Sequence, residues 1–176
     1  NESGSLRRSQ LVTTYGPGAI INLRSPKGAP VSAITGGLES WDDSARPRGL
    51  ANPQRCHLSR LEKKLKVRGF RLPPVNLKED RQGPSLVSKR FPMWLTCPKC
   101  NSLKRENKWQ KDNDTPSVER WCPKCTTRDK VFVVPVRFVM TCDRGHLDEF
   151  PWVYWLKTRG TPTEKSKDCS HEKLRL

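Results

Sequence analysis

The motif Cys-Pro-Lys-Cys occurs twice in this chain, at residues 97–100 and 122–125. Each copy places two thiols within reach of one ion, and residues 101–121 are long enough to turn back and bring the four sulfurs together. Zn²⁺ binds four thiolates in a tetrahedron at about 2.3 Å, and such a site has no open position for water or substrate. The spacing therefore predicts a structural zinc site with the ligands Cys97, Cys100, Cys122 and Cys125.

Other uses of paired cysteines fit this pattern less well. A thioredoxin-type Cys-x-x-Cys occurs once, at the start of a helix in a βαβ unit, whereas here the motif is repeated among strands and polar loops. Four thiolates also suit an iron–sulfur cluster, although the spacing does not call for one. Secreted disulfide frameworks are denser in short chains than the 7 cysteines here. The pattern favours a metal ion in a reducing compartment.

A bound metal would compensate for a small hydrophobic core. Only 34% of the residues are hydrophobic, and 15 prolines with 11 glycines leave little room for long regular elements. We expect a small α+β fold, β-rich and irregular, organised around a zinc ribbon. The expected division is 1–90, with short strands and one basic helix, and 91–176, with the zinc ribbon, a strand and an aromatic segment that continues beyond the chain end.

Two segments have a clear periodicity. The leucines Leu58, Leu61 and Leu65 recur at helical spacing and predict a helix over 56–69, which Gly69 can end. Residues 130–141 contain the most strand-like run of the chain. Because Pro135 lacks a backbone donor, this run is expected to be an edge strand or to break midway.

The chain is strongly basic, with 34 Lys and Arg against 18 Asp and Glu and a formal net charge of +16. A field of this size attracts polyanions, of which nucleic acid is the commonest in a cell, although an acidic protein face is an alternative. The candidate phosphate contacts are Lys63, Lys64, Arg105 and Lys108. Trp109, near the last two, can stack on a base or pack on the zinc ribbon, and packing is the commoner role of a lone Trp.

Cys142 and His146, four residues apart, could form half of a second metal site, with Cys169 and His171 or residues beyond the chain end as the other ligands. The alternative is a buried thiol beside a hydrogen-bonded histidine. Asp148 and Glu149 also allow His146 a catalytic role in a nuclease or hydrolase. A polar turn explains these acidic residues more simply, and we expect no enzymatic activity.

The segment 1–10 is polar and basic, unlike a signal peptide, and no apolar run approaches the roughly 20 residues of a membrane helix. We therefore expect a soluble, cytoplasmic protein that has no membrane partner. The chain does not begin with Met and stops shortly after Cys169 and His171, so we also expect it to be part of a longer protein.

Several blocks of the sequence, taken in order, resemble a known family. They are RRSQL at 7–11, YGPGA at 15–19, FPxWLxCPxC at 91–100, PVRFV at 135–139 and GHLDxFPW at 145–152. They resemble the N-terminal part of DrmB, the helicase-associated, zinc-binding subunit of the bacterial phage-defence system called DISARM. Family members are longer than this chain, in agreement with its abrupt end.

The resemblance implies a partner, DrmA, which is a large ATP-dependent helicase-like subunit. It also implies that the two act together on DNA, beside methyltransferases that mark the DNA of the host. The motor chemistry would belong to the partner. We therefore expect a non-catalytic, zinc-stabilised accessory subunit of a bacterial cytoplasmic hetero-complex. The rival interpretation is a free-standing zinc-ribbon nucleic-acid-binding protein of transcription or translation.

Overall fold

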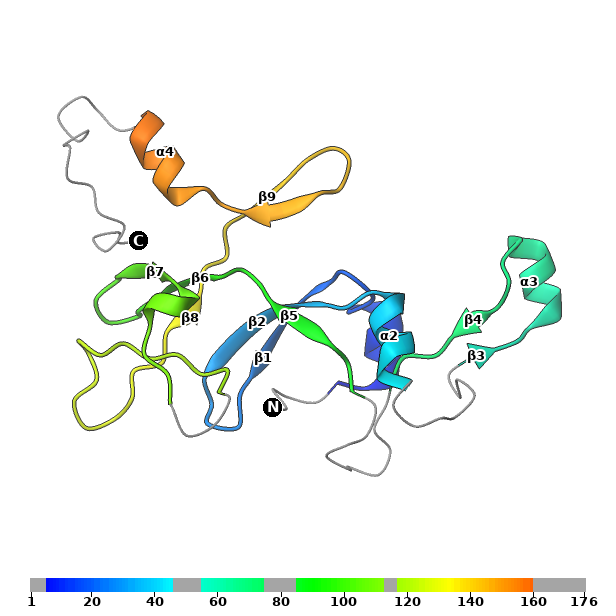
Figure 1. Ribbon diagram of the computed structural model, residues 1–176, viewed down its shortest axis with the longest axis horizontal. Coiled ribbons are helices and arrows are strands. Elements are labelled where there is room, and N and C mark those ends of the chain that lie inside the picture. Colours follow the sequence, from blue (N-terminus) through cyan, green and yellow to red (C-terminus); the bar gives the residue numbers. More distant parts are fainter. Residues whose placement is uncertain (1–5, 46–54, 75–84, 113–116, 160–176) are drawn as a thin grey trace. The chain divides into compact units, whose positions relative to one another are not determined.

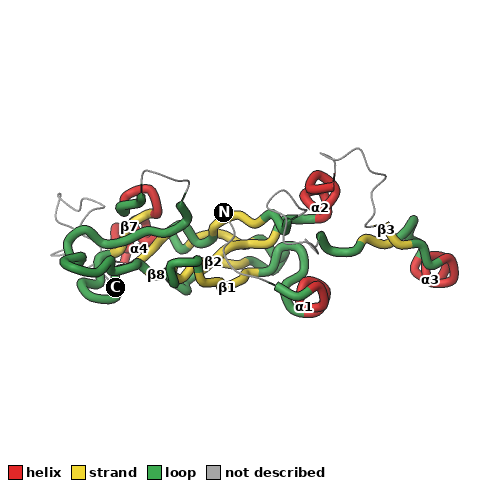
Figure 2. The backbone as a smooth tube through the Cα atoms, turned by 90° about the horizontal axis from the view of Figure 1, so that it is seen from below, coloured by secondary structure: helices red, strands yellow, loops and turns green. Residues whose placement is uncertain are grey.

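The computed structural model describes residues 6–45, 55–74, 85–112 and 117–159 of the chain. Short helices and short strands alternate with longer loops in this part of the chain (Figures 1 and 2). In order, the elements are α1 (Arg8–Thr13), β1 (Ile20–Arg24), β2 (Pro30–Thr35), α2 (Leu38–Ala45), β3 (Arg55–Cys56), α3 (Ser59–Leu65), β4 (Phe70–Arg71), β5 (Ser88–Arg90), β6 (Trp94–Thr96), β7 (Leu103–Arg105), η2 (Glu106–Lys108), β8 (Val134–Pro135), β9 (Val139–Thr141), β10 (Leu147–Glu149) and α4 (Trp152–Arg159). The small, sheet-rich α+β class expected from the sequence is confirmed.

The described strands form four small sheets, with the orders β1-β2-β5, β7-β6-β8, β9-β10 and β3-β4. The chain divides into two compact units: one contains residues 22–32 and those from 90 onward, and the other contains the helices α1 to α3. The strands β1 and β2 contribute residues to both units. No helix in the described ranges has the length and apolar character needed to cross a membrane.

Strand β6 is the centre of the first unit, because both of its faces are buried. It pairs antiparallel with β7 and with β8, and successive side chains of a strand point to opposite faces. On one face Leu95, which is 0% exposed, packs with Cys97, Trp109, Cys122 and Val133. On the other face Trp94 packs with Leu103 and Val136, and Trp152 and Val153 of α4 cover that cluster. Two adjacent residues of one strand, Trp94 and Leu95, thus join two small cores.

Strand β8 ends at Pro135, one residue before its last hydrogen bond to β6. Strand β8 lies at the edge of its sheet and consists of Val134 and Pro135 alone. The chain then passes through Val136, whose N–H still donates to the carbonyl of Trp94 at 3.1 Å, and enters β9 in another sheet. The prediction that Pro135 makes an edge and a break within 130–141 is confirmed.

Ion pairs join the β1–β2 turn to the rest of the first unit. Asp112 accepts hydrogen bonds from Lys130 at 2.5 Å and from Lys27 at 2.8 Å. The hydrogen bond from Lys130, and to a lesser extent the one from Lys27, lowers the pKa of Asp112 to about 2. Nearby, the Phe91 N–H donates to the carbonyl of Ser32 at 3.1 Å. This turn is therefore fixed to two segments that are distant in sequence.

In the second unit, the turn at residues 16–18 is closed onto β2 by one threonine. The buried hydroxyl of Thr35 donates to the carbonyl of Gly16 at 2.5 Å and accepts from the Ala19 N–H at 3.1 Å. Gly18 has φ +82°, a left-handed conformation that favours glycine, and its N–H donates to the Thr35 carbonyl at 3.0 Å. The loop between α1 and β1 is thus held against the end of β2 by several hydrogen bonds.

The predicted helix over 56–69 is shorter in the structure. It spans Ser59–Leu65, and the antiparallel strands β3 and β4 flank it with Cys56 opposite Phe70. Lys66 adopts the left-handed conformation at φ +54° and ends the helix before Gly69, which was expected to end it. The N–H groups of Lys66 and Val67 both donate to the carbonyl of Glu62. The left-handed residue at Lys66, and not a glycine, therefore sets the end of this helix.

The central role of Leu95 gives a direct test. Leu95→Ala removes a fully buried side chain beside the cysteines, and we expect it to lower the free energy of unfolding by about 2–5 kcal/mol. Chemical denaturation followed by tryptophan fluorescence measures this change. The matched variant Leu65→Ala removes a leucine that is 54% exposed and should change stability by about 0.5 kcal/mol or less. Equal losses for the two variants would contradict the packing described here.

Candidate metal centre

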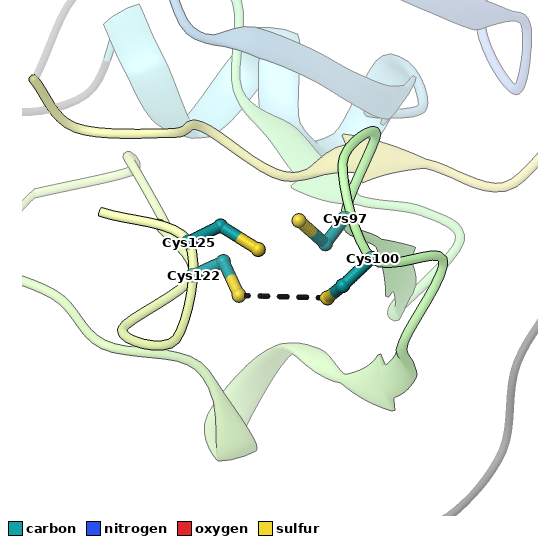
Figure 3. A group of neighbouring side chains, drawn as sticks. All are labelled: Cys97, Cys100, Cys122 and Cys125. Atoms are coloured by element: carbon teal, nitrogen blue, oxygen red, sulfur yellow. Dashed lines mark hydrogen bonds between the residues drawn. The ribbon is translucent and has the colours of Figure 1, made fainter. Parts of the chain in front are cut away.

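The structure brings the four cysteines of the two motifs together. Figure 3 shows their side chains pointing toward one another from two separate turns, and all four Sγ atoms lie within 4.8 Å of one another. The Sγ atoms of Cys100 and Cys122 are 3.9 Å apart, well beyond the roughly 2.05 Å of a disulfide bond. Four sulfurs at about 2.3 Å from one ion in a tetrahedron would be about 3.8 Å apart. The spacing of the sulfurs therefore suits a tetrahedral metal ion.

Both motifs form the same turn, which explains why their thiols can converge. The residue after the second cysteine donates its N–H to the carbonyl of the first: Asn101 to Cys97 at 2.9 Å, and Thr126 to Cys122 at 3.1 Å. A proline follows the first cysteine of each copy, where its fixed φ suits the second position of a turn. Each motif is therefore a pre-shaped loop that directs two thiols to one side.

The turns are held in place by neighbouring strands. The N–H of Cys97 donates to the carbonyl of Ser102 at 3.0 Å. This bond lies next to the Thr96–Leu103 pair, at the turn end of the β6–β7 ladder. The N–H of Cys122 donates to the carbonyl of Val131 at 2.9 Å. The first turn is therefore the loop of a hairpin, and the second is closed by a bond to the segment that leads into β8.

A cover of apolar side chains lies over the four thiols. Cys97 and Cys122 are buried, Cys100 and Cys125 are partly buried, and Leu95, Trp109 and Val133 pack against them. Trp109 is 6% exposed, and its indole N–H donates to the carbonyl of Lys104 at 3.2 Å. Of the two predicted roles for Trp109, packing is confirmed. Such an apolar shell limits access of water to bound metal.

The electrostatics of the cluster oppose ionisation of two of the four thiols. Burial raises the pKa of Cys122, and burial together with the neighbouring cysteines raises the pKa of Cys125 to about 12. By contrast, the hydrogen bond with Ser102, whose Oγ lies 3.2 Å from the Cys100 Sγ, lowers the pKa of Cys100 to about 6. A divalent cation among the sulfurs would reverse this balance, because thiolates are the form that binds metal. The cluster is thus suited to metal binding.

The predicted second metal site is described only in part. The Sγ of Cys142 lies 3.3 Å from Nδ1 of His146, across a turn in which the Gly145 N–H donates to the Cys142 carbonyl at 2.8 Å. Both side chains are exposed, so the alternative of a buried thiol is wrong for Cys142. Cys169 and His171 lie outside the described residues. A metal site at this turn stays a prediction.

Glu149, considered above as a catalytic acid, has a structural partner on each carboxylate oxygen. Oε2 accepts from Arg105 of β7 at 2.8 Å, and Oε1 accepts from the backbone N–H of Met93. Arg105 also lies over the ring of Trp94, with its Cζ 5.9 Å from the ring centroid. This link between β10 and the β6–β7 hairpin was not found from the sequence, because the two segments are far apart in the chain.

The four basic residues predicted to contact phosphate fall into two pairs. Lys63 and Lys64 are exposed on α3, in the second unit, whereas Arg105 and Lys108 are exposed on β7 and η2 of the first unit. Of the latter two, Arg105 pairs with Glu149, and that bond reduces its availability to a ligand. The second pair lies on the segment that also contributes Trp109 to the cysteine cluster.

Removal of one ligand should empty the centre. We expect Cys122→Ser to lower the metal content of the purified chain from about one ion to well below half an ion, and to lower its thermal stability, because three thiolates bind metal far more weakly. Elemental analysis and a thermal melt measure these changes. Cys56→Ser is the matched control, because Cys56 lies outside the cluster. Unchanged metal content in the Cys122 variant would contradict this assignment.

Metal affinity should also rise with pH. The raised pKa values of Cys122 and Cys125 mean that both thiols hold protons at neutral pH without metal, so binding must release these protons. Affinity should therefore weaken steadily as the pH falls from 8 to 5. Competition with a chelator at several pH values measures the slope, after correction for the chelator's own protonation. A flat profile would show that these thiols do not bind the metal.

Comparison with known proteins identifies a family. A family model described as "Domain of unknown function (DUF8724)" matches residues 7–176. No curated protein matches the chain. The match includes both Cys-Pro-Lys-Cys motifs and every helix and strand described above. The chain therefore belongs to the DUF8724 family.

Proposed function

We propose that the four-cysteine centre binds Zn²⁺ and that the surrounding turns and strands form a zinc ribbon. The support is the closed set of four sulfurs, the tetrahedral spacing, and two turns of the same form that face each other. The d electrons of zinc impose no geometry, so four thiolates can hold the ion in a tetrahedron. Cys₄ sites of this kind are structural. Iron would suit the same ligands, so the metal must be identified by elemental analysis of protein purified from its native host.

We further propose that the protein is a non-catalytic accessory subunit, which associates with a helicase-like ATPase of the DrmA type and with DNA in anti-phage defence. The sequence blocks that resemble the DrmB family support this role. Three of these blocks supply Trp94, Val136 and Trp152, which meet in one hydrophobic cluster of the first unit. The blocks thus include core residues of the scaffold, as shared ancestry would require.

A structural role for the metal supports the absence of catalysis. A centre with four thiolate ligands leaves no position where a substrate or an activated water can bind. Glu149, one of the acidic residues beside His146, is engaged by Arg105 and Met93. The chemistry of the complex is therefore assigned to the ATPase partner. The closed four-sulfur centre is the single observation on which this assignment depends.

The charge of the chain supports a place near DNA. With a formal net charge of +16, the protein would strengthen phosphate binding by its complex and make that binding sensitive to salt. We assign Lys108 and Arg105 to this contact as candidate phosphate ligands, with Arg105 exchanging its pairing with Glu149 for phosphate. Lys63 and Lys64 share a helix with exposed leucines, which points to a different surface.

Co-expression with the helicase-like subunit, followed by DNA binding at several salt concentrations, tests this proposal. We expect the two proteins to purify together, and we expect the complex to bind DNA at least about tenfold more tightly than this chain alone. A chain that binds nucleic acid tightly by itself, with a steep salt dependence and no affinity for the subunit, would instead be a free-standing zinc-ribbon protein. That result would overturn the accessory role.

A further inference from the structure

The helix α3 exposes its apolar residues to solvent, unlike the cores around β6. Leu58, Leu61 and Leu65 are 50%, 40% and 54% exposed, and none of the α3 residues is buried. Val67 and Leu72, which follow the helix, are also exposed. We call residues 55–72, which contain β3, α3 and β4, the α3 arm (Figure 1). These exposed side chains contribute little to a core within the described chain.

The exposed leucines lie on one side of the helix. Leu58 is the N-terminal cap residue, and Leu61 and Leu65 follow at steps of three and four residues, which places them along one face. This is the spacing by which an amphipathic helix inserts anchors into a groove of another protein. An isolated helix of seven residues, on a pair of two-residue strands, has little stability of its own. A binding surface would stabilise it.

The rest of the arm is positively charged. The exposed basic residues are Arg60, Lys63, Lys64, Lys66 and Arg68. Glu62 is the only acidic residue of the arm, and its carboxylate is already engaged. Its Oε1 accepts from the Leu58 N–H at 2.7 Å and lies 3.4 Å from Nδ1 of His57. The arm therefore combines an apolar stripe with a positive surface that Glu62 does not offset.

We propose that the α3 arm docks as a helix in a groove of a protein partner whose floor is apolar and whose rim is acidic. Leu58, Leu61 and Leu65 fill the floor, and the basic side chains pair with the rim. The identity of the partner rests on the proposed function: it is the helicase-like subunit. The arm is then the element through which the accessory subunit is held, and Lys63 and Lys64 contact protein and not DNA.

Other occupants fit the arm less well. DNA would neutralise the lysines but would leave the leucines in water, because phosphate contacts do not bury apolar side chains. A second copy of the arm would bring like charges together. Binding to a membrane surface strengthens with the apolar area that a helix inserts, and the seven-residue α3 offers only a short stripe of leucines. A groove in an acidic protein satisfies both features.

Two double variants of the chain test the proposal in binding to the purified helicase-like subunit. Leu61→Gln with Leu65→Gln removes two anchors without a change of charge, and glutamine maintains helix propensity. Lys63→Gln with Lys64→Gln removes charge and leaves the leucines. The control Val12→Gln replaces an exposed apolar residue of α1, outside the arm. Because these positions are exposed, all three proteins should fold, and a thermal melt of each verifies this.

We expect the leucine variant to bind the subunit at least about tenfold more weakly at any salt concentration. The lysine variant should lose several-fold at low salt and little at high salt, because salt screens exposed charge. The control should bind like the native chain. Equal binding by the leucine variant would overturn the docking role while leaving the proposed function intact. If the native chain does not bind the subunit, both proposals fail.

Parallel measurements with a DNA duplex and with anionic lipid vesicles separate the remaining sources of affinity. The native chain and the leucine variant should bind the duplex equally, and they should also bind anionic vesicles equally, because only charge acts in both cases. A loss of duplex or vesicle binding in the leucine variant, with no loss toward the subunit, would assign the arm to nucleic acid or to a membrane surface. Either result would contradict the proposal.

Discussion

The architecture of the first unit depends on the close approach of four thiols, two of which resist ionisation unless a cation neutralises them. Burial and mutual contact raise the pKa values of Cys122 and Cys125, so the cluster resists the charge that metal binding requires. A divalent ion removes this cost, because it neutralises the thiolates. Since the thiolates belong to two separate turns, the ion also holds those turns together. Leu95, Trp109 and Val133 pack around the same sulfurs, so metal and core stabilise one another. In a chain with so few hydrophobic residues, this coupling replaces a larger core.

Local patterns in the sequence predicted the features that depend on local chemistry. The repeated motif indicated that four sulfurs would meet, and Pro135 indicated where a strand would end, because both follow from residues within a few positions of one another. Long-range contacts had no such signal. The bond between Arg105 and Glu149, and the position of Asp112 between Lys27 and Lys130, join segments whose proximity is set by the fold. The spacing of the leucines in α3 identified a helix, but periodicity alone cannot say whether an apolar face meets the protein's own core or solvent.

The two units present different surfaces for function. The first contains the closed cysteine centre, with exposed Arg105 and Lys108 on the hairpin side of that centre. The second contains the α3 arm, in which exposed leucines and lysines occur together on a helix that buries none of its residues. Under the proposed function, the arm would hold a motor subunit, and the basic residues beside the cysteine centre would contact DNA. The DUF8724 family, whose model covers nearly all of the chain, offers natural sequence variants in which this division can be examined.

The central claim is that one zinc ion is held by four sulfurs, and X-ray absorption at the zinc edge of the purified protein tests it most directly. The account predicts about one zinc per chain, with a first coordination sphere of four sulfur atoms at about 2.3 Å and no nitrogen or oxygen. A sphere that contains nitrogen or oxygen in place of a sulfur would mean that the four cysteines do not form a closed site. A folded protein without any bound metal would contradict the account altogether.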